Sequence, residues 1–135
     1  MTAPPPPPRS WYPLALALVA IVTLGLASRA VRFFPDPLGA YPGDALWAVM
    51  AYLLLAMAAP EATPRRLAAA ALAVSFTVEA LQLVRWDWLV TLRGTLPGRL
   101  VLGSGFDPAD LAAYTVGVGL AFGADLAWAR ARRAR

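Results

Sequence analysis

The sequence contains no cysteine and no histidine, and all twelve of its basic residues are arginines. The absence of cysteine excludes disulfides, thiolate catalysis and cysteine-ligated metals. The absence of histidine excludes a histidine general base, a histidine-ligated zinc ion and a histidine pH switch. Because lysine is missing too, Schiff-base catalysis by a lysine is excluded. We therefore expect no metal and no cofactor, and any chemistry must use Asp, Glu, Arg, Tyr, Ser or Thr.

Charge of either sign is also scarce. Charged residues make up 15% of the 135 residues and hydrophobic residues 59%, whereas a soluble domain carries roughly 25% charged residues. Four apolar stretches are long enough, or nearly so, for the roughly 17–25 residues of a membrane-spanning helix. The sequence therefore predicts an integral membrane protein. Its formal net charge is +4, but the arginines are dispersed at helix ends, so nucleic-acid binding is not expected.

The predicted fold is all-α, a polytopic membrane protein with four transmembrane helices. These helices are expected at about 11–28, 44–59, 64–85 and 107–128. They form a transmembrane domain over 11–129, preceded by a disordered Pro-rich tail at 1–10 and followed by a basic tail at 130–135. A long irregular loop separates the third helix from the fourth, and its residues 94–106 are either re-entrant or interfacial.

Prolines and short polar residues mark the predicted helix starts. Thr63 followed by a proline fits an N-cap and first helical position. Asp107, also followed by a proline, fits the N-cap of the last helix, and Asp110 fits the third helical position, much like a capping box. Asp44 follows a glycine and fits the N-cap of the second helix. Capping alone can therefore explain these aspartates, and a functional role is the alternative.

The arginines predict the orientation in the membrane. With four spans, both termini lie on the same side. That side holds seven arginines: Arg9, Arg65, Arg66, Arg130, Arg132, Arg133 and Arg135. The other side holds five: Arg29, Arg32, Arg85, Arg93 and Arg99. Because basic residues are enriched in cytoplasmic loops, both termini are expected in the cytoplasm.

Polar side chains are expected to meet at the face of the bundle away from the termini. In an up-down arrangement, the end of the first helix, the start of the second, the end of the third and the start of the fourth share that face. Ser75, Glu79 and Gln82 lie on one stripe of the third helix because they are spaced by four and three residues. The candidate polar site consists of Arg29, Asp44, Glu79, Gln82, Arg93, Asp110 and Tyr114.

Glu79 is the most unusual member of this site because it lies within an apolar helix. An ionised carboxylate at the centre of a bilayer costs roughly 2.5–3.5 kcal/mol. Glu79 must therefore be protonated, hydrated or paired, and an arginine can grip a carboxylate with two hydrogen bonds. Arg29 and Arg93 are the candidate partners. Such a pair either serves a function or simply holds the third and fourth helices together.

Five segments, taken in order, resemble a family of small bacterial integral membrane proteins, the domain-of-unknown-function family 2809. The segments are GLASR (25–29), YPGDALWAVMAY (41–52), VEALQL (78–83), LRGTLPGRLVLGSGF (92–106) and DLAAYTVG (110–117). The likeness covers about residues 14–125. It implies a multi-pass protein of the bacterial cytoplasmic (inner) membrane, and it implies no particular activity because the function of that family is unknown.

A looser likeness links the chain to VanZ-like proteins. These carry a Glu-x-x-Gln on one helix, and an Asp at the start of the next helix is followed by small residues and a Gly. Glu79, Gln82, Asp110 and Gly117 fill those places here. An earlier Asp-Lys-x-x-His of that group has only Asp44 as its counterpart, without the lysine or the histidine. This likeness implies a role in the cell envelope, such as low-level glycopeptide resistance.

Four functions stay open at this point. The first is an accessory protein of the envelope that binds a membrane lipid, for instance one with a phosphate-bearing headgroup, or a lipid-linked precursor at the outer face. The second is a membrane enzyme acting on a lipid-linked substrate, with Glu79 and Asp110 as acid and base. The third is a purely structural membrane scaffold. The fourth is a small transporter or a proton pathway through Glu79.

Overall fold

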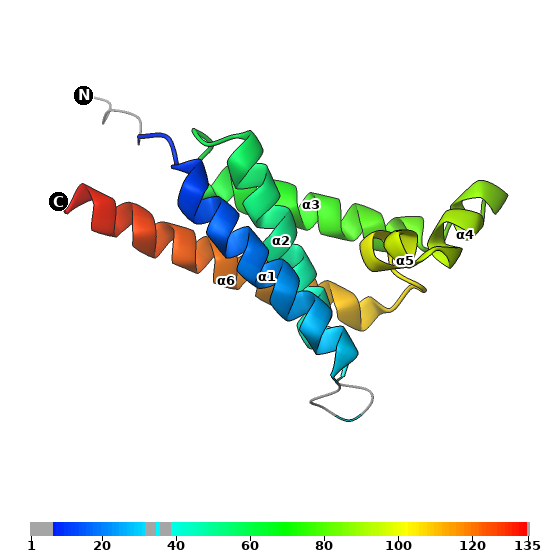
Figure 1. Cartoon of the computed structure of the whole chain (residues 1–135). Helices are drawn as coiled ribbons and strands as arrows, with labels where there is room; N and C mark the ends of the chain where they lie inside the picture. The colour runs from blue at the N-terminus through cyan, green and yellow to red at the C-terminus, as the bar shows by residue number, and fades with distance from the viewer. Residues whose placement is uncertain (1–6, 32–34, 36–38, 135) are drawn as a thin grey trace.

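The computed structural model describes residues 7–31, 35 and 39–134. Within that part of the chain the secondary structure is entirely helical, which confirms the predicted all-α class (Figure 1). The helices are α1 (Trp11–Ala30), α2 (Tyr41–Ala58), α3 (Pro64–Leu81), α4 (Asp87–Gly94), α5 (Leu96–Leu102) and α6 (Pro108–Arg133). Arg32, Arg135 and residues 1–6 of the predicted tail lie outside the described residues.

The four long helices form an up-down bundle with α2 at its centre. Helix α2 packs against α1, α3 and α6, and α3 also packs against α6. The first and last described residues, 7 and 134, lie at the same end of the bundle. At the other end, α4 extends beyond the end of α3 and α5 lies beside that end (Figure 1). The last turn of α1, the first turn of α2, the end of α3 and the start of α6 therefore share one end, as predicted. We call it the acidic end, after Asp44, Glu79, Asp107 and Asp110, and the opposite one the terminal end.

The core of the bundle is built from small residues and two tyrosines. Ala48 and Ala56 of α2 and Ala71 of α3 are buried, together with Tyr52 and Tyr114. Lipid offers no hydrophobic drive for helices to associate, so close van der Waals packing through small side chains supplies the attraction. Helices α2 and α6 approach closely where Gly117 lies against the backbone of Ala45.

Helix α1 is attached more loosely than the other three long helices. None of its twenty residues, all of which are described, is buried. It packs against α2 alone among the described helices. Its apolar side chains, such as Leu16, Val19 and Leu24, are exposed in the isolated chain. This is the composition expected of a helix that faces lipid.

Three of the described helices, α1, α2 and α6, are long and apolar enough to cross a membrane, rather than the four predicted. The difference is α3. It has 18 residues, as α2 has, but it carries Arg65, Arg66 and Glu79. These charged residues lower the mean hydropathy of α3, so α3 is not apolar enough to be identified as a membrane span by length and composition.

Several boundaries differ from those predicted. Helix α2 begins at Tyr41, so Asp44 lies in its first turn and is not its N-cap. Helix α3 ends at Leu81 instead of residue 85, and α6 runs on to Arg133, through most of the predicted basic tail. Two caps are as predicted. Thr63 accepts from the Arg66 N–H at 3.4 Å, and Asp107 accepts from the Ala109 N–H at 2.9 Å.

The segment predicted as an irregular loop folds into the two short helices α4 and α5. Thr95 separates them and caps α5, because its hydroxyl accepts from the Gly98 N–H at 3.1 Å. Trp86 and Trp88 are exposed and stack with their ring centroids 6.1 Å apart. Paired exposed tryptophans are typical of the membrane–water interface.

We expect Gly117→Ala to destabilise the bundle, because the new Cβ would collide with the carbonyl oxygen of Ala45 on α2. Overpacking of this kind costs about 1–3 kcal/mol of unfolding free energy. The measurement is thermal unfolding of the purified protein in detergent. The matched control is Gly119→Ala on the same helix, where no described atom lies within 4 Å of the new Cβ, so its stability should equal or slightly exceed that of the wild type. Equal losses in both variants would contradict the close approach of α2 and α6.

Candidate functional site

Glu79 is the buried centre of the acidic end. Its side chain lies on α3 and is 0% exposed. One carboxylate oxygen accepts from the backbone N–H of Asp107 at 2.7 Å, and the other accepts from the hydroxyl of Tyr114 at 3.1 Å. The carboxylate therefore joins the end of α3 to the first two turns of α6. The predicted ion pair of Glu79 with Arg29 or Arg93 is wrong. Among the described residues, no arginine lies within ion-pair distance of Glu79.

This contact changes the way in which α6 is capped. In a capping box, the third helical residue accepts from the backbone N–H of the N-cap residue. Here the N–H of Asp107 is taken by Glu79 from another helix. The predicted box with Asp110 is therefore wrong, and the side chain of Asp110 is left for another role. The start of α6 is positioned by tertiary structure as well as by its own sequence.

Asp110 instead faces Asp44 across the interface between α2 and α6. The two carboxyl groups lie near enough to influence each other electrostatically. Two acids on facing helices are thus close neighbours at the acidic end.

Arg29 supplies the positive charge beside this pair. Its guanidinium lies 3.6 Å from the carboxylate of Asp44, and the side chains are 40% and 15% exposed. Gly43 helps to bring the start of α2 close to the end of α1. A Cβ at position 43 would lie only 3.3 Å from the Ser28 hydroxyl oxygen. Arg29, Asp44 and Asp110 form a group of mixed charge that is partly open to the surroundings, and we call it the mixed-charge site.

Arg93 and Gln82 lie apart from the mixed-charge site. The guanidinium of Arg93 donates to the backbone carbonyls of Leu81 and Val84, the latter at 3.1 Å, and thereby caps the C-terminal end of α3. Gln82 is 8% exposed and packs against Gly103, whose φ of +74° and lack of a side chain are both required there. Its carbonyl oxygen has no hydrogen-bond partner among the described residues.

The seven predicted site residues are therefore divided by the structure. Arg29, Asp44 and Asp110 form the mixed-charge site, and Glu79 with Tyr114 forms the hydrogen-bonded lock behind it. Because both oxygens of Glu79 are engaged inside the bundle, it is poorly placed to act as a general base. Within the described part of the chain, no group of acidic side chains has the arrangement needed to hold a metal ion.

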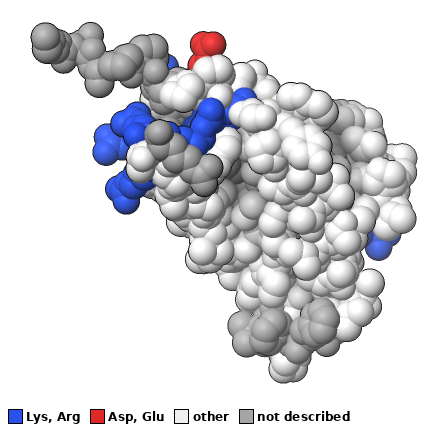
Figure 2. Space-filling view, turned by 60° about the vertical axis from the view of Figure 1, so that its left-hand side comes forward, with Lys and Arg blue, Asp and Glu red and all other residues white. Residues whose placement is uncertain are grey.

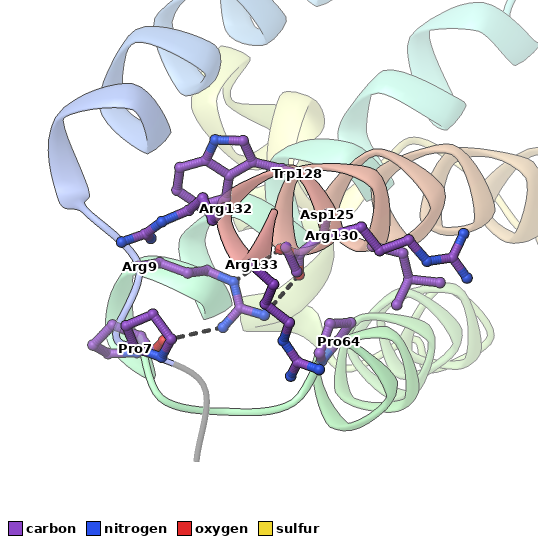
Figure 3. Close-up of a pocket in the computed structure, with 11 residues that line it drawn as sticks. Pro7, Arg9, Pro64, Asp125, Trp128, Arg130, Arg132 and Arg133 are labelled. Atoms are coloured by element: carbon purple, nitrogen blue, oxygen red, sulfur yellow. Dashed lines mark hydrogen bonds and ion pairs between the residues drawn. The ribbon is translucent and has the colours of Figure 1, made fainter. Parts of the chain in front are cut away.

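Sequence reasoning missed a second polar lock at the terminal end. The guanidinium of Arg9 grips Asp125 with two hydrogen bonds of 3.0 and 2.8 Å, and both side chains are more than nine-tenths buried (Figure 3). Arg9 also donates to the carbonyls of Pro60 and Ala62 at 3.0 and 2.6 Å. The hydroxyl of Tyr52 donates to Asp125 at 2.6 Å.

This lock differs from one expectation. Arg9 lies in the predicted disordered tail, 1–10, but it is fixed against α6. Its partner Asp125 lies 116 positions later in the sequence. The sequence does carry a signal for this contact: an up-down topology brings the start of the first helix beside the end of the last, and Arg9 precedes the first while Asp125 lies near the end of the last.

Most of the chain matches a known protein family. A family model described as "Protein of unknown function (DUF2809)" matches residues 34–118. The matched region includes Asp44, Glu79 and Asp110, and it stops before Asp125. No solved structure matches the chain. The looser likeness to VanZ-like proteins stays a prediction.

Glu79→Gln should be tolerated far better than Glu79→Leu. The glutamine carbonyl can accept from the Asp107 N–H, and its amide can donate to the Tyr114 hydroxyl. Leucine instead leaves the N–H without an acceptor, which costs about 1–3 kcal/mol. Unfolding free energies of both variants in detergent are the measurement. Equal destabilisation by glutamine and leucine would mean that the negative charge of Glu79, and not its hydrogen bonding, holds α3 to α6.

Proposed function

Because the chain belongs to the DUF2809 family of proteins of unknown function, we propose a function from its own geometry. We propose that it is a four-span protein of the bacterial cytoplasmic membrane that binds the headgroup of a membrane lipid or lipid-linked precursor. The headgroup binds at the mixed-charge site of the outer face. The partly open arrangement of Arg29, Asp44 and Asp110 is the observation that carries this proposal.

The proposal of a fourth span depends on α3. Its 18 residues extend over about 27 Å at about 1.5 Å per residue, close to the roughly 30 Å of the hydrocarbon core. Arg65 and Arg66 lie in its first turn and are exposed, so their long side chains can reach the interface. Glu79 has its hydrogen bonds satisfied inside the bundle. Each charged side chain of α3 can thus either reach the interface or form hydrogen bonds inside the bundle, and both are compatible with a helix that crosses the bilayer.

The proposed orientation places the terminal end in the cytoplasm. Basic side chains gather over one end of the molecule in Figure 2. The exposed arginines at the terminal end are Arg65, Arg66, Arg130, Arg132 and Arg133. The rule that basic residues stay on the cytoplasmic side therefore supports an outward-facing acidic end.

The chemistry of the mixed-charge site favours a headgroup that carries both charges or several hydroxyls. Arg29 offers a cation that is 40% exposed and can bind a phosphate. Asp44 and Asp110 offer carboxyl oxygens that can accept from an ammonium or a sugar hydroxyl. The exposed Trp86 and Trp88 support a position of the same end of α3 at headgroup depth. A zwitterionic phospholipid headgroup, with one phosphate and one ammonium, matches these groups.

A structural role accounts for Glu79 separately. Its two hydrogen bonds tie α3 to α6, and it is fully buried, so a ligand does not reach it. We therefore assign Glu79 to the scaffold and the mixed-charge site to binding. No observation favours catalysis by Glu79 and Asp110, because both carboxylate oxygens of Glu79 are engaged by Asp107 and Tyr114 inside the bundle.

Single cysteines introduced at Glu61 and Ser104 test the four-span topology. Both residues are exposed, they lie on either side of α3, and the wild-type chain has no cysteine to give background. We expect a membrane-impermeant maleimide to label Ser104→Cys in intact cells and Glu61→Cys only after permeabilisation. Labelling of both from the same side would show that α3 does not cross the membrane.

Native mass spectrometry of the purified protein tests headgroup binding. We expect a phospholipid bound to the wild type and retained about tenfold less by Arg29→Gln, because a charge-assisted hydrogen bond contributes about 1.5–3 kcal/mol. Asp110→Asn should lose it as well. The matched control is Asp87→Asn, an exposed acid on α4 outside the site. An unchanged lipid complement in both site variants, with unchanged thermal stability, would contradict the proposal.

A further inference from the structure

A hollow of about 360 Å³ opens at the terminal end, away from the mixed-charge site (Figure 3). One wall consists of Pro7, of Pro60 in the α2–α3 connection and of Pro64 at the start of α3. The last three turns of α6 form the other wall, which presents Leu126, Trp128 and three arginines. The hollow therefore combines an apolar lining with a basic rim. Its volume is within the range of small-molecule sites, about 300–1,000 Å³.

The Arg9–Asp125 lock makes this hollow a preformed feature. Arg9 is bound at once to Asp125 and to the carbonyls of Pro60 and Ala62. These bonds fix the segment before α1, the α2–α3 connection and α6 relative to one another. Because Arg9 and Asp125 satisfy each other, the lock contributes little net charge to the hollow.

The net charge comes from Arg130, Arg132 and Arg133, which are exposed. Arg132 lies 4.9 Å from the ring centre of Trp128, and it donates to the carbonyl of Pro8 at 3.4 Å. Among the described residues, no carboxylate forms an ion pair with any of the three. Arginines are common at helix C-termini and on cytoplasmic faces, and this explains why α6 ends in three of them. It does not explain why these arginines line a hollow.

We propose that this hollow binds the phosphate of an anionic phospholipid. Arg130 and Arg133 are three residues apart, so they lie on neighbouring positions of one helix face and can hold the phosphate from two sides. Leu126 and the prolines accommodate the glycerol and the first part of the acyl chains. The proposal is independent of the mixed-charge site, which lies at the opposite end of the bundle.

A lipid fits this hollow better than a soluble phosphate does. Its lining is mostly apolar, and a free phosphate would leave that lining uncovered. The hollow also lies where the long helices end, which is the depth at which headgroups are found. Binding of a lipid therefore uses both the arginines and the apolar wall.

The test is lipid retention by the full chain from vesicles of phosphatidylcholine with a minor fraction of phosphatidylglycerol. The protein is extracted in detergent and washed at about 1 M salt, where the Debye length falls to about 3 Å and diffuse attraction is screened. We expect the wild type to retain phosphatidylglycerol and Arg133→Gln to retain about tenfold less. Ala129→Trp, which fills the hollow without a change in charge, should lose it too.

Arg65→Gln is the matched control, because Arg65 is an exposed arginine at the same end that does not line the hollow. Its retention of phosphatidylglycerol should equal that of the wild type. An equal loss in Arg65→Gln, or full retention in Ala129→Trp, would overturn the proposal in favour of diffuse surface charge. Displacement of the lipid by inorganic phosphate alone would overturn the lipid assignment. Arg29→Gln should leave this retention unchanged, which separates this site from the outer one.

Discussion

The acidic end of the bundle depends on the burial of one carboxylate. Glu79 is enclosed between α3 and α6 and receives two hydrogen bonds, from a backbone N–H and a tyrosine hydroxyl. A buried carboxylate without such donors would be strongly destabilising, so the two helices cannot separate there without leaving it unsatisfied. This constraint determines where α6 begins, and it sets Asp110 against Asp44.

The terminal end solves a similar problem with an ion pair. Arg9 and Asp125 are both nearly buried, and Tyr52 and two backbone carbonyls satisfy their remaining hydrogen-bonding groups. A buried pair of charges is stable only when such additional bonds are present. Between the two ends, alanines and Gly117 allow the helices to pack closely. The bundle therefore has a polar lock at each end and a tightly packed apolar middle.

These locks determine which polar groups are available to a ligand. Glu79, Arg93 and Arg9 are engaged inside the protein, although the sequence alone made Glu79 and Arg93 attractive site residues. Among the described polar groups that remain open are Arg29 with its two aspartates at one end and the arginines of α6 at the other. In our proposals, the two ends of one small bundle hold different headgroups.

The sequence by itself determined the all-helical class, the up-down order, the caps at Thr63 and Asp107 and the family, since these follow from local composition and motifs. It also placed Arg29, Asp44, Glu79 and Asp110 at one end, because helix direction alternates. Only the tertiary structure decided the partners. Arginine fits a carboxylate in general, but the distance across the α3–α6 interface favours an N–H and a hydroxyl for Glu79. Likewise, residues 9 and 125 meet only after α1 and α6 have both docked on α2.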